Sequence, residues 1–456
     1  MILLTDTTNA GSGTYEYIIM GAAVIILSFL FNAFSERSNI PSVLLLIVLG
    51  FLLNTNLGPG MSGDALKEPL ELMGTVGLIM IVLEAALDLE LTKEKYPLIL
   101  RSLAIALVGL VSTSLLIALV LVNMYDSDVM SWQSAMLYAT PLSILSSAII
   151  IPSVGGLGQR KKEFHIYEST FSDILGIMQF YFLQAIWGPE TQGFAAETGN
   201  YVLILLGTVL FSLIVSYGLI FLFQSIKSHV KLFLLISILL LLYAVGKINH
   251  VSSLITIFLF GLVMSNHKLF FRGKLKEWLN EKTVSGLEAD FHVVTIETAF
   301  LVRTFFFVLF GMTISIAPFS TLDSALSILK VSFAILAVIY GARLIYFRIF
   351  IGKDIVPQLF IAPRGLITVL LFYQISPESV VEEFNEGILS FIIVASLLVM
   401  SGALILHGRR KGRMERIESD PMIIPPDQIY KGFSSKVVRD RYSQPKEAEP
   451  QSQSNS

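Results

Sequence analysis

Long apolar stretches, separated by clusters of Gly, Pro or charged residues, recur along most of the chain. Each is close to the roughly 20 residues that an α-helix needs to cross a hydrocarbon core of about 30 Å. The apolar pattern predicts about thirteen such segments and therefore an all-α, polytopic membrane protein. The predicted limits are 15–34, 41–55, 70–89, 98–123, 133–154, 165–187, 200–225, 231–247, 251–266, 292–316, 323–351, 357–374 and 386–407.

The positions of Lys and Arg test this segmentation independently, because cytoplasmic loops of membrane proteins are enriched in both. Fourteen of them lie in or at the edge of loops after odd-numbered segments, and only Lys67 lies in a loop after an even-numbered segment. A miscount by one segment would scramble this alternation. We therefore expect a multi-pass protein of the cell (inner) membrane with its N-terminus outside and its C-terminus inside, in agreement with the basic cluster at 409–411.

Composition supports a membrane-embedded body and excludes a soluble multidomain protein. Charged residues make up only 15% of the 456 residues, against roughly 25% in a soluble domain. The net charge of −3 and the lack of a separate basic domain argue against nucleic acid as a partner. The absence of Cys excludes disulfides and thiolate metal sites. We expect an extracytoplasmic segment (1–14), a transmembrane domain (15–407) and a disordered cytoplasmic tail (408–456).

Several ionisable residues fall inside the predicted segments, where each charge costs at least about 2.5 kcal/mol and marks a candidate for function. Charges near the ends of segments are expected to reach the membrane surface with their long side chains. The deeper candidates are Glu84, Glu168, Asp173, Glu297, Arg303, Arg343 and Arg364.

A polar stripe runs along the sixth predicted segment. It consists of Ser169, Ser172, Asp173 and Gly176. These residues fall within about 100° of one another around a helix, which predicts that they line a cavity. Glu168 points about 140° away from Asp173, so the two carboxylates are expected to have different neighbours.

Depth along the helices indicates which charges can meet. Asp173 and Arg343 lie at similar depths near the membrane midplane, and Glu168 lies some 7 Å nearer the inside, within reach of a long side chain. We therefore expect a buried Glu168–Arg343 ion pair that leaves Asp173 free to bind. Burial disfavours its charged form, so a proton and a dehydrated cation can compete for it. A protonated, hydrogen-bonded Asp173 is the structural alternative. Arg303 could pair with Asp173 or with Glu297 as a counter-ion.

Two predicted segments are interrupted by Pro or Gly at matching places. The residues concerned are Thr140, Pro141, Ser146 and Ser147 in the fifth segment and Pro363, Arg364 and Gly365 in the twelfth. Such interruptions free backbone groups that ions and water can satisfy but lipid cannot. The two segments cross in opposite directions, as expected for inverted repeats with a binding site at their interface. Simple proline kinks are the alternative.

These residues resemble the monovalent cation:proton antiporter superfamily of the sodium/proton exchanger type. The run Glu168-Ser169-x-x-Ser172-Asp173 is similar to its Glu-Ser-x-x-Asn-Asp motif, and the resemblance extends over about residues 15–407, with further blocks at 40–41, 260–266, 305–312 and 363–365. It implies a core and a dimerisation subdomain, crossing discontinuous helices, a homodimer and an elevator-like movement. It also implies that Asp173 binds the cation and the proton, and that Glu168 pairs with Arg343.

Two departures from the family pattern bear on the exchange. Ser172 stands where relatives have Asn or a second Asp, and a single carboxylate favours electroneutral exchange. Ser146-Ser147-Ala148 replaces the Thr-Asp-Pro of many relatives and resembles the potassium-efflux branch, so both Na+ and K+ stay open. We predict a secondary active antiporter of the lipid bilayer that exchanges Na+ or K+ for H+, without a cofactor. The predicted ion and proton ligands are Asp173, Ser172, Ser169, Thr140, Ser146 and Ser147.

Other classes of function compete with this interpretation. A cation channel or leak pathway without proton coupling would also need a polar stripe, but not a titrating carboxylate. An intramembrane hydrolase would need a nucleophile with its base. Apart from His250 and His292 at the ends of segments, we expect no His within a predicted segment to serve Ser172 as a base, and therefore no enzyme.

Overall fold

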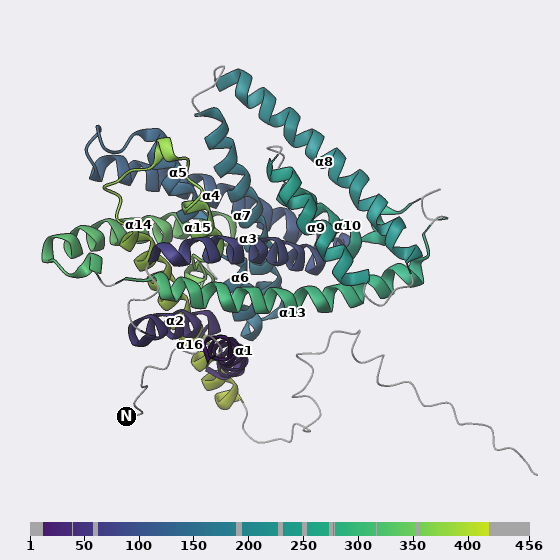
Figure 1. The fold of residues 1–456 in the computed structure, drawn as a ribbon, viewed down its shortest axis with the longest axis horizontal. Helices are drawn as coiled ribbons and strands as arrows, with labels where there is room; N and C mark the ends of the chain where they lie inside the picture. The colour runs from purple at the N-terminus through teal and green to yellow at the C-terminus, as the bar shows by residue number, and fades with distance from the viewer. Residues whose placement is uncertain are drawn as a thin grey trace, which may run out of the picture. The chain divides into compact units, whose positions relative to one another are not determined.

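The computed structural model describes residues 12–38, 40–57, 63–187, 194–226, 231–248, 253–272, 277, 279–315, 317–352 and 355–418. Within these ranges the chain forms helices and turns and no β-strand, which confirms the predicted all-α class (Figure 1). The chain divides into two compact units, residues 1–409 and 410–456. Most of the predicted N-terminal segment (1–11) and most of the predicted tail (419–456) lie outside the described residues.

Eight helical segments in the described ranges are long and apolar enough to cross a membrane, and three shorter helices are apolar as well. They coincide with predicted segments, although the total of about thirteen spans stays a prediction. The long and shorter apolar helices that run without a break are α1 (Ser12–Ser38), α2 (Ser42–Leu57), α3 (Gly63–Asp88), α4 (Tyr96–Met124), α8 (Phe194–Ser225), α9 (Lys231–Ile248), α10 (Ser253–Ser265), α13 (Glu281–Thr313), α14 (Leu322–Phe350) and α16 (Glu386–Glu418).

Both predicted interruptions are present in the backbone. α5 (Trp132–Ser143) is separated from α6 (Ser147–Ser153) by three non-helical residues, and the short turn η4 (Gln358–Phe360) is separated from α15 (Leu366–Phe372) by residues 361–365. The remaining short elements are α11 (His267–Phe270), η1 (Lys93–Lys95), η2 (Val154–Gly156), η3 (Ala317–Phe319) and η5 (Pro377–Ser379).

Some helices extend beyond the limits predicted from the apolar pattern. α13 begins at Glu281, whereas the predicted segment begins at residue 292. The side chain of Asn280 caps this helix by accepting a hydrogen bond from the Thr283 N–H at 3.2 Å. α16 continues to Glu418, past the predicted limit at residue 407. Hydropathy marks the thickness of the hydrocarbon, whereas capping side chains determine where a helix begins.

The helices pack in two groups. The α7 group contains α4, α5, α6, α14 and α15 around α7 (Gln159–Ile186), and the α3 group contains α1, α2, α3, α8, α9, α10 and α13. Figure 1 shows α13 running between α3 on one side and α2 on the other. The two groups meet where α15 and α6 pack against α3 and where α7 packs against α8. The interruptions therefore lie close to the boundary between the groups.

Candidate functional site

The two interrupted segments cross at their breaks. The Ser146 N–H donates a hydrogen bond to the carbonyl oxygen of Pro363 at 3.0 Å. A Cβ atom added to Gly365 would lie 2.5 Å from Ser146 Oγ and 2.7 Å from Ile149 Cδ1. Gly365 therefore permits the close crossing, because a side chain at this position would overlap the side chains of Ser146 and Ile149 and force them to shift.

Helix α7 lies against the non-helical residues 144–146. The Leu145 N–H, freed by the break in its helix, donates to Ser172 Oγ at 3.0 Å. Gly176 allows this approach, since a Cβ atom at that position would overlap the Ile144 side chain. The predicted polar stripe of α7 therefore faces the break between α5 and α6, and Ser172 satisfies one of the backbone groups that the break leaves open.

Asp173 is buried on α7, with 2% of its surface exposed. Its carboxyl group contacts the hydroxyl and the backbone N–H of Ser147, the first residue of α6. Among the described residues, its Oδ1 atom has no hydrogen-bond partner. A buried carboxylate with an unused oxygen needs a ligand, because an unpaired charge away from water is costly.

The predicted pair of Glu168 and Arg343 is formed. Arg343 Nη1 and Nη2 donate to Glu168 Oε1 and Oε2 at 2.8 and 2.9 Å, a bidentate geometry. Each side chain is 1% exposed. Arg343 also donates to the Gln358 carbonyl and the Tyr346 hydroxyl, and its guanidinium carbon lies 4.2 Å from the centre of the Phe347 ring. Glu168 is therefore committed to a fixed cation and is separate from Asp173.

His165 is a third member of this cluster that the sequence reasoning missed. It is fully buried, and its Nδ1 atom lies 3.1 Å from Glu168 Oε2. The signal was available, because residues three apart on a helix lie on the same face. His165 is the first residue of the predicted segment 165–187, and the apolar pattern alone does not mark a residue at that position as buried.

Arg364 lies in the second break and holds the end of α5. Its Nε atom donates to the carbonyl of Leu142 at 2.5 Å, and Nη1 donates to the carbonyl of Ala362 at 2.9 Å. Its backbone N–H donates to Ser396 Oγ of α16 at 3.0 Å. The last carbonyls of a helix have no partner inside the helix, and a cation there is favourable. Arg364 forms no salt bridge with a described residue.

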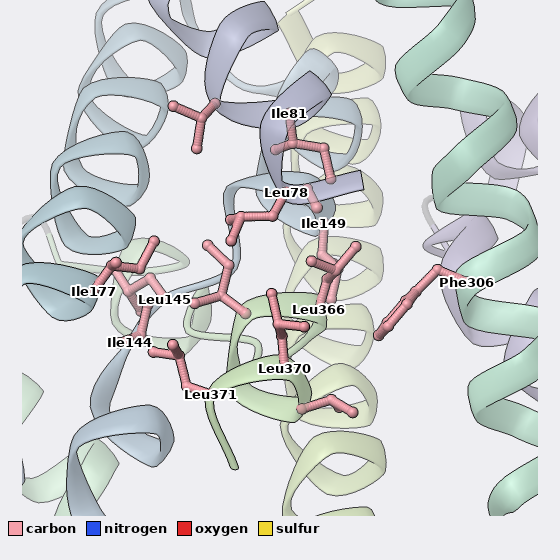
Figure 2. Close-up of a cluster of buried hydrophobic side chains, with 14 of the residues drawn as sticks. Leu78, Ile81, Ile144, Leu145, Ile149, Ile177, Phe306, Leu366, Leu370 and Leu371 are labelled. Carbon is pink, nitrogen blue, oxygen red and sulfur yellow. The ribbon is translucent and has the colours of Figure 1, made fainter. Parts of the chain in front are cut away.

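A cavity of about 10 Å³ lies beside the ion pair, about the space that one water molecule needs. Its polar lining is formed by Thr113, Ser143, Glu168, Ser172, Arg343, Tyr346 and Arg364. Asp173 does not line it. Figure 2 shows that apolar side chains surround the breaks, including Leu78 and Ile81 of α3 and Leu366 of α15. The breaks are thus packed mainly by hydrocarbon.

Two of the predicted ligand residues have other partners. Ser169 Oγ donates to the His165 carbonyl within α7 at 2.7 Å. Thr140 Oγ1 donates to the Met136 carbonyl at 2.8 Å and accepts from Gln179 Nε2 at 3.2 Å. Gln179 lies about 9 Å along α7 from Asp173. Of the predicted ligands, Ser147 contacts Asp173 directly, whereas Ser169 and Thr140 are held in separate hydrogen bonds.

The structure corrects the expected partners of Arg303 and Glu297. Arg303 Nη2 lies 3.3 Å from Glu84 Oε2, so Arg303 pairs with Glu84 rather than with Asp173 or Glu297. Its Nη1 atom donates to the Ala148 carbonyl at 2.9 Å. Glu297 is exposed and forms no ion pair within the described ranges. The depth arithmetic failed here because it does not determine which helices are lateral neighbours.

An apolar helical body in which two interrupted helices cross beside a buried carboxylate is the architecture of a secondary transporter. The family described as sodium/hydrogen exchanger, transmembrane, matches residues 23–406. The chain therefore belongs to the sodium/hydrogen exchanger family, whose members are transporters rather than enzymes. A search of curated protein sequences found no significant match.

Two solved structures of the sodium proton antiporter MjNhaP1 from Methanocaldococcus jannaschii share this fold. One is 17% identical, has a TM-score of 0.61 and covers 87% of this chain and 99% of its own. The other is 18% identical, has a TM-score of 0.62 and covers 90% of this chain and 99% of its own. The predicted resemblance and antiporter fold are therefore confirmed, and the chain is a multi-pass membrane protein. None of these findings supports the channel alternative.

Proposed function

We propose that the protein exchanges a monovalent cation, Na+ or K+, for H+, and that Asp173 binds both in turn. The observation that carries this proposal is the state of its carboxyl group. It is buried, contacts the neutral hydroxyl and N–H of Ser147, and has one oxygen without a hydrogen-bond partner among the described residues. Membership of the sodium/hydrogen exchanger family and the relative named as a sodium proton antiporter favour Na+.

Competition at one carboxylate couples the two ions. In the proposed mechanism a proton neutralises Asp173 from one side of the membrane, and a cation replaces it from the other. Oxygen ligands suit Na+ and K+, and the Ser147 hydroxyl supplies a neutral oxygen at the carboxylate. Ser172 and Ser146 flank the same break.

We further propose that the exchange is one for one and electroneutral. The Glu168–Arg343 and Glu84–Arg303 pairs have no net charge. A proton and a monovalent cation each add one positive charge to Asp173, so the proton-loaded and cation-loaded forms carry the same charge. Ser172 occupies the position where a second carboxylate would change this balance.

The proposed cellular arrangement follows the charge pattern and the family. We propose a homodimer in the cell (inner) membrane, with the N-terminus outside and the C-terminus inside. The Lys and Arg asymmetry of the loops supports the orientation, and the family resemblance supports the homodimer and an elevator-like movement of the α7 group against the α3 group.

Exchange in proteoliposomes tests the proposal. Purified protein is reconstituted with an acidic lumen containing a pH-sensitive dye, and Na+, K+ or Li+ is added outside. We expect alkalinisation with at least one cation in the wild type, none with Asp173→Asn, and unchanged exchange with Glu297→Gln, which replaces an exposed carboxylate in the same way. Equal exchange by Asp173→Asn and wild type would refute the role of Asp173. Cation flux without a pH change would favour the channel.

A further inference from the structure

A polar link joins the two groups of helices next to the candidate site. Arg303 of α13, in the α3 group, donates from Nη1 to the carbonyl oxygen of Ala148 at 2.9 Å. Ala148 lies in the first turn of α6, in the α7 group. It directly follows Ser147, whose hydroxyl and N–H contact Asp173. Arg303 therefore holds the short helix that contacts the ion-binding carboxylate.

The charge of Arg303 is balanced by Glu84, which belongs to the same α3 group of helices. Its Nη2 atom lies 3.3 Å from Glu84 Oε2 of α3, and the two side chains are only 12% and 10% exposed. Among the described residues, Arg303 Nε has no hydrogen-bond partner. Because Glu84 neutralises the guanidinium, Arg303 can bind the Ala148 carbonyl without acting as a permanent counter-ion to Asp173.

Arg303 lies on α13, which packs along α3, the helix of Glu84, and closely against α2. A Cβ atom on Gly311 of α13 would overlap the backbone of α2, and one on Gly50 of α2 would overlap the backbone of α13. Small residues of this kind let membrane helices pack closely. Ala148 belongs to the other group, so the Arg303–Ala148 hydrogen bond must lengthen or break whenever α6 moves relative to α13.

We propose that the Glu84–Arg303 pair is a latch between the two groups of helices. Arg303 grips α6 through Ala148 and stabilises the described conformation, and it releases the helix when the α7 group moves to expose Asp173 to the other side of the membrane. Arg303 is thus a positioning residue that sets the balance between the two access states. This inference rests on the proposed alternating access to Asp173.

The latch has a measurable consequence. A hydrogen bond from a charged donor is worth about a tenfold change in an equilibrium, or more. The apparent affinity for a cation on one side of the membrane is reduced in proportion to the fraction of protein open to that side. Loss of the latch therefore changes the ratio of the cation KM values on the two sides by about tenfold. A purely structural defect would lower the maximal rate on both sides and leave the ratio unchanged.

The experiment measures the KM for Na+, or for K+ if only K+ is exchanged, at each face in proteoliposomes of known orientation. We expect Arg303→Gln and Glu84→Gln to shift the ratio in the same direction, and the double variant to shift it no further, because both changes disable one device. Glu297→Gln is the matched control, as it makes the same chemical change on the exposed face of α13. An unchanged ratio in Arg303→Gln, or an equal shift in the control, would overturn the latch.

Arg303→Lys keeps the experiment decisive should Arg303→Gln fail to fold. A lysine retains the charge opposite Glu84 but lacks the fork that lets Arg303 bind two acceptors. We expect a smaller shift of the KM ratio in the same direction, and an unchanged ratio would again overturn the latch. The test is distinct from that of Asp173, because it compares the two faces of exchangers that still transport.

Discussion

Removing either partner of the Glu168–Arg343 pair is expected to destabilise the protein. The loss of stability should depend on pH when Glu168 is left unpaired and not when Arg343 is left unpaired. In Arg343→Met the buried Glu168 loses both bidentate hydrogen bonds, and His165 is its remaining hydrogen-bond partner among the described residues. Stranding one member of a buried ion pair costs about 3–5 kcal/mol. A carboxylate can lower this cost by taking up a proton, whereas a guanidinium cannot lose one.

The magnitude follows from the cost of that proton. An ordinary glutamic acid has a pKa of about 4.3, so protonation at about pH 7.5 costs about 4 kcal/mol, in the same range as the stranding penalty. In folded Arg343→Met we expect Glu168 to be neutral, whereas in the unfolded chain it is ionised. Unfolding then releases a proton, so the stability of the variant rises as pH falls, by about 1.4 kcal/mol per pH unit down to about pH 4.3.

The assay is thermal unfolding of detergent-solubilised protein between about pH 7.5 and pH 5.5. Relative to wild type, Arg343→Met is expected to recover about 2.7 kcal/mol over this range. Glu168→Gln should not recover, because the stranded Arg343 stays charged, although the Gln358 carbonyl and the Phe347 ring still surround it. The double variant removes both charges and is expected to be close to wild type in stability.

Lys330→Met provides the control for the loss of a cation from α14, because Lys330 is exposed on the same helix. It should unfold like wild type at every pH. If Arg343→Met were destabilised equally at both ends of the pH range, or were no less stable than the control, Glu168 would not depend on Arg343 for its buried charge, and the reasoning would be refuted.

Two further predictions concern the crossing of the breaks. Gly365→Ala places a methyl group 2.5 Å from Ser146 Oγ. We expect the exchange rate in proteoliposomes to fall at least about tenfold with little change in expression, because a displacement of about 1 Å near a site has large effects on rate. Exchange at the wild-type rate would show that the breaks need not stay in contact. Ser172→Asp adds a second carboxylate beside Asp173. We expect its exchange to generate a membrane potential, which a voltage-sensitive dye detects. Exchange that generates no potential would contradict the proposal that the number of carboxylates sets the charge moved in each cycle.

The features that could be predicted from the sequence depend either on the backbone of a single helix or on the depth of a residue in the membrane. The break at residues 144–146, just after Pro141 in the last turn of α5, and the break at residues 361–365 follow from backbone chemistry, because Pro and Gly weaken a helix whatever its neighbours are. The Glu168–Arg343 pair follows from the rise per residue, because membrane thickness places residues of different helices on one scale of depth. These features needed no knowledge of which helix neighbours which.

The features that could not be predicted depend on lateral packing. Depth alone left Arg303 with Asp173 and Glu297 as partners, whereas the packing of α13 against α3 brings it to Glu84. Thr140 lies on the interrupted helix as expected, but its side chain faces Gln179 of α7. The apolar pattern of a membrane helix marks its lipid-facing length and carries little information about its neighbours.

In the proposed function, the apolar surroundings of the breaks enforce the coupling of the two ions. Leu78, Ile81 and Leu366 pack around the breaks (Figure 2), and Asp173 is buried on α7. An ionised Asp173 that moved through such surroundings without a ligand would lack both water and a counter-ion, which is the most costly state of a carboxylate. A bound proton or cation removes that cost. The protein can therefore change its access with either ion bound but not with an empty site, and this restriction makes the transport an exchange rather than a leak.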